Sequence, residues 1–144
     1  MQEEKFIAIQ ENKIRYLEDG ASSNVIMLVH GLGASAERWN HIMPYFRKNY
    51  CVIVPDLPGF GLSDKPSIDY TIDFFVRSLS EFIESLGIQN SILVGSSFGG
   101  QIITELAIAE PKLINKMILV SPSGVVNYST LALDAYIGAA ISPT

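Results

Sequence analysis

Short, predominantly apolar runs alternate along this chain with longer segments in which apolar residues recur every three or four positions. The short runs are typical of strands buried on both faces, and the longer spacing is typical of helices with one buried face. The strand pattern occurs at residues 25–29, 51–54, 91–94 and 117–120, and the helix pattern at residues 36–48, 71–86 and 101–109. This alternation predicts an α/β fold with a mostly parallel sheet whose strands are joined by right-handed crossovers.

Both ends of the chain depart from this alternation. Residues 5–10 and 13–18 are two strand patterns separated by Glu11 and Asn12, which predicts an N-terminal antiparallel hairpin. Residues 128–141 are apolar on most of their surface and carry one carboxylate, Asp134, so a helix formed there needs a surface to pack against. We therefore divide the chain into a core at residues 1–124 and a separate segment at residues 125–144.

The last predicted strand, residues 117–120, contains neither a charge nor a proline. Proteins commonly place such residues at an exposed sheet edge, because they discourage pairing with another chain. Their absence, together with the apolar segment that follows, suggests that the chain was cut from something longer. We expect this edge either to associate with a second copy or to receive further strands from a missing C-terminal half.

Composition excludes several classes of function. The 144 residues are 48% hydrophobic, carry a net charge of −5 and contain no basic stripe, so nucleic acid is not an expected partner. One cysteine, Cys51, and a start without a signal-peptide pattern favour the cytoplasm. No apolar run is long enough to cross a membrane. No cluster of histidine, cysteine and carboxylate residues has metal-ligand spacing, so no metal is expected.

A serine flanked by glycines follows the strand pattern at residues 91–94. Gly95-Ser96-Ser97-Phe98-Gly99 fits G-x-S-x-G and precedes a helix pattern. In this setting the glycines permit a sharp turn that lifts the Ser97 hydroxyl clear of the sheet, as in a nucleophile elbow. The simpler interpretation is that Ser97 only caps the helix, since serine is a favoured N-cap residue. The two glycine loops upstream favour the elbow.

These upstream loops read His30-Gly31-Leu32-Gly33 and Asp56-Leu57-Pro58-Gly59-Phe60-Gly61-Leu62-Ser63-Asp64. With the elbow, their order and spacing resemble the N-terminal half of an α/β-hydrolase of the large cap-bearing group that includes esterases, lipases, thioesterases and carbon–carbon bond hydrolases. The resemblance implies an α/β-hydrolase fold that lacks its last strands. Residues 125–144 would begin the cap above the active site.

The resemblance also implies a role for each residue of the loops. Ser97 would be the nucleophile, and the backbone N–H groups of Leu32 and Phe98 would form the oxyanion hole. The surrounding turns would be supported by His30, Gly31, Gly33, Gly95 and Gly99. Asp56 would anchor its own loop by hydrogen bonds. The substrate would be a small molecule with an ester or similar acyl group, and no cofactor would be needed.

The base that should activate Ser97 has no counterpart in the sequence. In this family the acid and the histidine follow the serine, but the only histidines here, His30 and His41, precede it. Some members of the family carry the acid after the sixth strand instead, but this chain has Ser121-Pro122-Ser123 at that place and therefore no acid. We therefore predict that the 144-residue chain alone is nearly inactive, and a non-catalytic binding role stays open for it.

A different class of function has its own sequence basis. Gly31, Gly33 and Ala36 fit G-x-G-x-x-A between a strand and a helix, and Asp56 ends the next strand. This is the pattern of a dinucleotide-binding loop with its ribose-binding acid. The hairpin ahead of it and the second glycine turn at Ser97 are unexplained by that pattern. Dinucleotide binding is therefore the alternative hypothesis.

Overall fold

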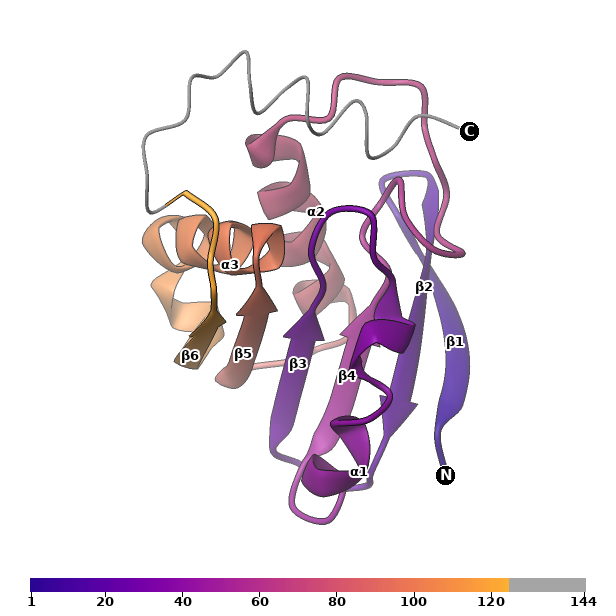
Figure 1. The fold of residues 1–144 in the computed structure, drawn as a ribbon, viewed down its shortest axis with the longest axis vertical. Coiled ribbons are helices and arrows are strands. Elements are labelled where there is room, and N and C mark those ends of the chain that lie inside the picture. The colour runs from indigo at the N-terminus through magenta and orange to yellow at the C-terminus, as the bar shows by residue number, and fades with distance from the viewer. Residues whose placement is uncertain (125–144) are drawn as a thin grey trace.

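A computed structural model describes residues 1–124 as a six-stranded sheet with helices on both faces (Figure 1). The strand order is β1-β2-β4-β3-β5-β6, and β3, β4, β5 and β6 are parallel to one another. The strands are β1 (Glu3–Ile9), β2 (Asn12–Asp19), β3 (Val25–Val29), β4 (Cys51–Pro55), β5 (Ser91–Ser96) and β6 (Ile114–Val120). The predicted mixed sheet with an N-terminal hairpin is confirmed.

The hairpin turns one residue earlier than the sequence pattern suggested. Gln10 and Glu11 both have positive φ angles, 49° and 65°, and Ile9 pairs with Asn12. A two-residue turn with this left-handed backbone matches the twist of antiparallel strands. β2 then pairs with β4 in the antiparallel sense, which attaches the hairpin to the parallel part of the sheet.

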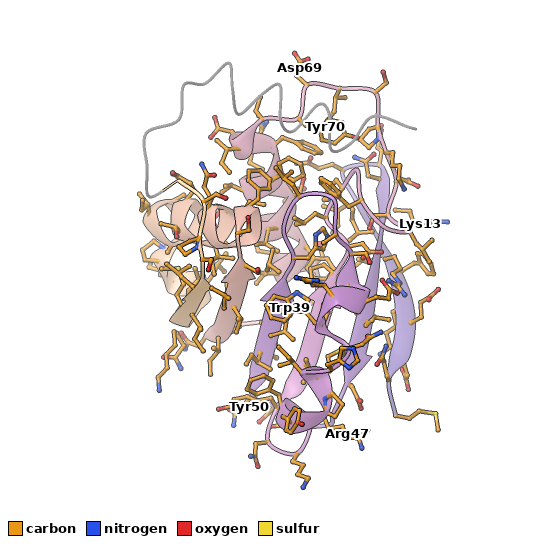
Figure 2. The ribbon with its side chains drawn as sticks, viewed as in Figure 1. Lys13, Trp39, Arg47, Tyr50, Asp69 and Tyr70 are labelled. Carbon is orange, nitrogen blue, oxygen red and sulfur yellow. The ribbon has the colours of Figure 1, made fainter. Side chains whose placement is uncertain are left out.

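The helices cover the sheet unequally. α2 (Ile72–Ser85) and α3 (Phe98–Ala109) pack on one face, where the larger hydrophobic core includes Phe75, Phe82 and Ile102. The opposite face is covered by η1 (Ala36–Trp39) and α1 (Met43–Phe46), and a short 3-10 turn, η2 (Pro111–Leu113), precedes β6. Trp39 lies over this second face, 5% exposed (Figure 2).

The prediction of one helix over residues 36–48 was wrong. The structure has two short pieces, η1 and α1, with His41 in the turn between them. Pro44 lies in the first turn of α1, where its missing N–H costs nothing, but it cannot continue a helix that starts upstream. The apolar spacing survives the break, because Ala36, Trp39 and Met43 all face the same hydrophobic cluster.

β6 forms one edge of the sheet, but its predicted character needs a correction. The strand begins at Ile114 rather than Met117 and therefore includes the charged Lys116. Its last four residues are apolar and between 37% and 47% exposed. The predicted segment at residues 125–144, including the helix pattern at 128–141, lies outside the described residues. Across residues 1–124 we find no helix with the length and hydropathy of a membrane span.

Candidate active site

Ser97 occupies a strained turn between β5 and α3. Its φ and ψ angles are 53° and −116°, which places a non-glycine residue on the left-handed side of the backbone map. Strain of this kind costs on the order of 1–3 kcal/mol and persists only where the surroundings impose it. The predicted strand, sharp turn and helix around Ser97 are therefore present.

The neighbouring glycines are required by the closeness of the chain to itself. A Cβ atom on Gly95 would lie 2.6 Å from the Gly99 carbonyl oxygen, and one on Gly99 would lie 2.4 Å from that of Val29. Both distances are below any tolerable carbon–oxygen contact. The glycines thus let α3 begin directly against β3 and β5, which fixes the position of Ser97.

The Ser97 hydroxyl does not cap the helix. Ser97 stands at the N-cap position of α3, yet its side chain makes no capping hydrogen bond. Its oxygen instead lies 3.3 Å from the hydroxyl oxygen of Ser123, in the turn after β6. The simpler interpretation of Ser97 as a capping residue therefore has no support in its contacts.

The loop after β3 comes close to this hydroxyl. An idealised Cβ on Gly31 would lie 3.2 Å from the Ser97 Cβ, so the two loops are in contact. Within residues 1–124, the backbone N–H groups of Leu32 and Phe98 have no hydrogen-bond acceptor. A hollow of about 450 Å³ opens here, lined by Gly31, Leu32, Gly33, Ala34, Ser35, Arg38, Ser96 and Ser97.

The Phe98 ring does not line this hollow. It is 1% exposed and packs edge-on against Phe75, with ring centroids 5.2 Å apart. Phe60 is also buried, against the His30 ring. Both aromatic side chains are therefore part of the packed interior beneath the loops. Any contribution of Phe98 to the hollow comes from its backbone.

His30 is fully buried and both of its ring nitrogens are engaged. Nε2 accepts a hydrogen bond from the Leu57 N–H at 3.0 Å, so Nδ1 carries the proton and donates it to the Gly31 carbonyl oxygen at 2.7 Å. Burial lowers the pKa of His30 below its ordinary value of 6.5. This neutral histidine ties the loop after β3 to the loop after β4 and has no free lone pair for a proton from Ser97.

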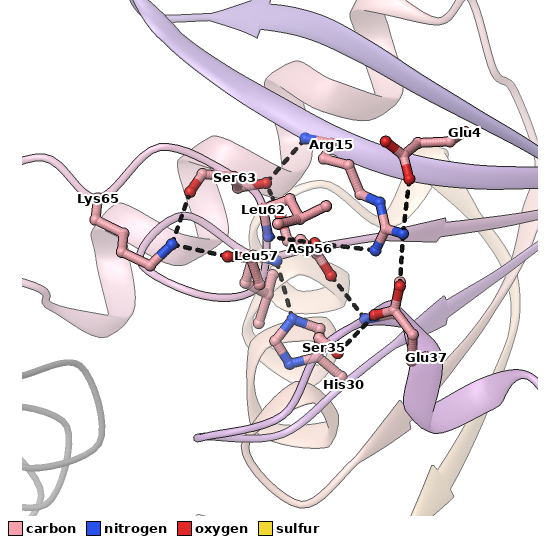
Figure 3. A network of polar contacts seen from close by, with 12 residues as sticks. Glu4, Arg15, His30, Ser35, Glu37, Asp56, Leu57, Leu62, Ser63 and Lys65 are labelled. Carbon is pink, nitrogen blue, oxygen red and sulfur yellow. Dashed lines mark hydrogen bonds and ion pairs between the residues drawn. The ribbon is translucent and has the colours of Figure 1, made fainter. Parts of the chain in front are cut away.

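Asp56 is the centre of a buried polar network (Figure 3). One carboxylate oxygen accepts from the Ala36 N–H at 2.7 Å; the other accepts from the Leu62 N–H at 2.8 Å and from the Arg15 guanidinium at 3.2 Å. A Cβ on Gly61 would lie 2.2 Å from the same carboxylate. Asp56 therefore anchors its loop as predicted. Its engaged, buried oxygens do not favour the ribose contact that the dinucleotide hypothesis requires.

Arg15 is a buried cation that sequence reasoning missed. Its guanidinium is 4% exposed and bonds to Glu4 and Glu37 as well as to Asp56. The bonds from Arg15 and from the Ser35 hydroxyl lower the pKa of Glu37 to about 2. Through Ser35 and Glu37 this network holds the end of the loop that carries Leu32. The sequence did not indicate this burial, because the alternation of residues along a strand predicts only toward which face of the sheet the arginine side chain points.

A second hollow, of about 490 Å³, lies at the opposite end of the sheet beside Asp19. Its charged groups pair with one another: the terminal amine and Arg47 contact Asp19 at 3.2 and 3.5 Å, and Lys5 contacts Glu18 at 3.0 Å. Among the residues within 1–124 that line it, none combines a strained backbone with a nucleophilic side chain. No group of three potential metal ligands occurs within residues 1–124. The chemistry therefore points to the hollow at Ser97.

A sequence model described as "alpha/beta hydrolase fold" matches residues 24–141 of the chain. The chain belongs to the α/β-hydrolase fold family. This establishes the family predicted from the three loops, and it leaves the dinucleotide hypothesis without support.

Members of the α/β-hydrolase fold family with different substrates match the same region. The chain is 35% identical over 127 residues to a 2-hydroxy-6-oxo-6-(2'-aminophenyl)hexa-2,4-dienoic acid hydrolase of Metapseudomonas resinovorans, covering 85% of the chain and 43% of that protein. It is 35% identical over 105 residues to a strigolactone esterase of Arabidopsis thaliana, covering 70% of the chain and 39% of that protein. The chain thus spans less than half the length of these two relatives.

A solved structure of a hydrolase is also similar to this chain. A serine hydrolase involved in carbazole degradation superimposes with a TM-score of 0.82 at 29% identity, covering 96% of this chain and 56% of that chain. The comparisons therefore support a hydrolase fold whose first half contains the Ser97 turn.

Proposed function

We propose that the protein containing this chain is a serine hydrolase in which Ser97 attacks an ester or similarly activated acyl carbon. The observation that carries the proposal is the Ser97 turn. Ser97 has a strained backbone, lies against the Gly31 loop, and lines the hollow of about 450 Å³. In the proposed reaction the Ser97 oxygen bonds to the acyl carbon while its proton passes to the base that the full-length protein supplies, and that base gives the proton to the leaving group as its bond to the acyl carbon breaks. Water then attacks the acyl carbon, one of its protons passes through the same base to the Ser97 oxygen, and the acyl group leaves as an acid.

The backbone N–H groups of Leu32 and Phe98, which have no acceptor within residues 1–124, are the proposed oxyanion hole. Charge develops on the acyl oxygen as the tetrahedral intermediate forms, and preorganised N–H donors stabilise it. Leu32 supplies one donor from the loop after β3 and Phe98 supplies the other from the first turn of α3. The start of a helix also carries partial positive charge, which favours the anion at Phe98.

The proposed substrate class is a small molecule with a reactive carbonyl carbon. Relatives include a dienoic acid hydrolase and an esterase, so both ester and carbon–carbon cleavage are candidates. The test is hydrolysis of p-nitrophenyl butyrate and of a 2-hydroxy-6-oxo-dienoate by the natural full-length protein. Activity on either should fall by at least about a thousandfold in Ser97→Ala.

The matched control is Ser67→Ala, which removes a hydroxyl from an exposed loop serine. It should keep wild-type activity. A fluorophosphonate should label the wild-type protein on the peptide that contains Ser97 and should leave Ser97→Ala unlabelled. Wild-type turnover in Ser97→Ala would overturn the proposed nucleophile.

For residues 1–144 alone we propose very low activity. His30 has no free nitrogen, and His41 lies exposed in the turn between η1 and α1. A serine without its base loses several orders of magnitude in rate and keeps only the contribution of binding and the oxyanion hole. An ordinary esterase turnover by this chain, abolished in Ser97→Ala, would contradict the proposal.

For the same chain we propose self-association through the β6 edge. The backbone groups on its outer side face no neighbouring strand within residues 1–124, and four consecutive apolar side chains are more than a third exposed. A second copy can pair along this edge and cover those side chains. Size-exclusion chromatography should show dimers or larger species, and a monomer stable at high micromolar concentration would count against it.

A further inference from the structure

The turn that follows β6 is joined to Ser97 by its backbone. β5 and β6 are parallel neighbours, so their carboxyl ends lie at the same edge of the sheet. The Ser97 N–H donates to the Val120 carbonyl at 3.0 Å, and the Ser123 N–H donates to the Ser97 carbonyl at 2.9 Å. Both polar groups of the Ser97 backbone are thus bonded to the segment at residues 120–123.

This turn is also packed tightly against the start of α3. A Cβ on Gly100 would lie 2.8 Å from the Pro122 Cβ, so only a glycine admits the proline ring. Ser121 has a φ of 45°, a second non-glycine residue in the left-handed region beside Ser97. Such a backbone is kept only where the packing imposes it. The Ser123 side chain is therefore presented from a fixed position.

The Ser123 hydroxyl faces the Ser97 hydroxyl from the β6 side. The two oxygens are 3.3 Å apart, and Ser123 is the only hydrogen-bond partner of the Ser97 side chain within residues 1–124. The Gly31 loop approaches Ser97 from the other side, because β5 lies between β3 and β6. The Ser97 hydroxyl oxygen thus lies between the Gly31 loop, whose Leu32 N–H has no acceptor within residues 1–124, and the Ser123 hydroxyl.

We infer that Ser123 is a positioning residue for Ser97. A serine side chain has three staggered positions, and a hydrogen bond from a fixed neighbour selects one of them. In the attack the Ser97 proton leaves for the base, so the Ser97 oxygen must accept and the Ser123 hydroxyl must donate. This inference rests on the proposed function of Ser97. It assigns to Ser123 no contact with the substrate and no transfer of the proton.

The test compares Ser123→Ala and Ser123→Thr in the natural full-length protein. Loss of one neutral hydrogen bond should lower kcat about fivefold in Ser123→Ala, with KM changed less than twofold, because the bond orients the nucleophile and does not bind substrate. Ser123→Thr keeps the hydroxyl and should restore at least half of kcat. The rate of phosphonate labelling at Ser97 should follow the same order.

A merely structural role for Ser123 would give a different result. It would lower the urea midpoint, move KM together with kcat and leave Ser123→Thr no better than Ser123→Ala. That pattern would overturn the inference, as would a kcat for Ser123→Ala within twofold of wild type while Ser97→Ala is inactive. Activity in Ser97→Ala would instead overturn the proposed function. Should Ser123→Ala fold poorly, Ser123→Cys keeps the size, weakens the bond, and should fall between alanine and wild type.

Discussion

Replacing Asp56 with asparagine should destabilise the protein far more than its small change in shape suggests. The carboxylate is fully buried and accepts three hydrogen bonds, from the Ala36 N–H, the Leu62 N–H and the Arg15 guanidinium. A carboxamide has the same size but keeps only one acceptor oxygen. Its NH₂ group must then face at least one of these donors, and Arg15 loses its buried counter-charge.

The expected loss follows from the donor left without an acceptor and from the lost charge. In Asp56→Asn the carboxamide oxygen can take the place of the carboxylate oxygen that bonds Leu62 and Arg15, which leaves the Ala36 N–H unpaired and removes the negative charge beside Arg15. Each buried unpaired donor costs about 1–3 kcal/mol, and breaking a buried charge pair costs about 3–5 kcal/mol. We therefore expect the free energy of unfolding to fall by about 4 kcal/mol, a large share of the roughly 5–15 kcal/mol typical of a folded domain.

Urea denaturation followed by circular dichroism measures this loss. With a slope of about 1.5 kcal/mol per molar urea, the midpoint should fall by about 2.5 M. The single tryptophan, Trp39, lies three residues after Ala36 and gives a second readout, since its emission should shift to the red if η1 loosens. Asp69→Asn is the matched control, because Asp69 lies on an exposed loop (Figure 2). A loss below about 1 kcal/mol in Asp56→Asn would refute the reasoning.

Two further predictions concern the turn at Ser97 and the buried histidine. Gly99→Ala should lower the free energy of unfolding by more than about 3 kcal/mol, because the new Cβ would lie 2.4 and 2.5 Å from two backbone oxygens. Gly33→Ala has no atom within 4 Å of the new Cβ and should lose only about 1–2 kcal/mol, the cost of its positive φ. Equal losses for the two variants in urea melts would contradict this prediction. The pKa of His30 is lower in the folded protein than its ordinary value of 6.5, so the unfolded chain binds a proton at this side chain more readily. The contribution of His30 to the free energy of unfolding is therefore fully present above pH 6.5 and is lost as the pH falls below that value. Urea melts between pH 7.5 and 5.5 should show this slope in wild type and in His41→Gln but not in His30→Gln, and a slope retained in His30→Gln would assign it to other groups.

Local patterns were sufficient to predict that each strand exists, though not where β6 begins, and to predict the turn at Ser97. Apolar runs follow from burial on both faces of a parallel sheet, and the glycines at 95 and 99 mark a place where the chain touches itself. The helix predicted over residues 36–48 failed for a local reason as well, because the spacing was read without the effect of Pro44. The elements were therefore predictable to the extent that neighbouring residues determine them.

The sequence by itself determined the fold class, the family resemblance and the identity of the candidate nucleophile, because each depends on spacing within a few tens of residues. Tertiary structure alone decided that Arg15 is buried against Asp56, 41 positions away, and that Ser123 faces Ser97, 26 positions away. It also decided that both nitrogens of His30 are engaged. These contacts arise where separate loops meet at one edge of the sheet, and no periodicity along the chain encodes which side chains meet there.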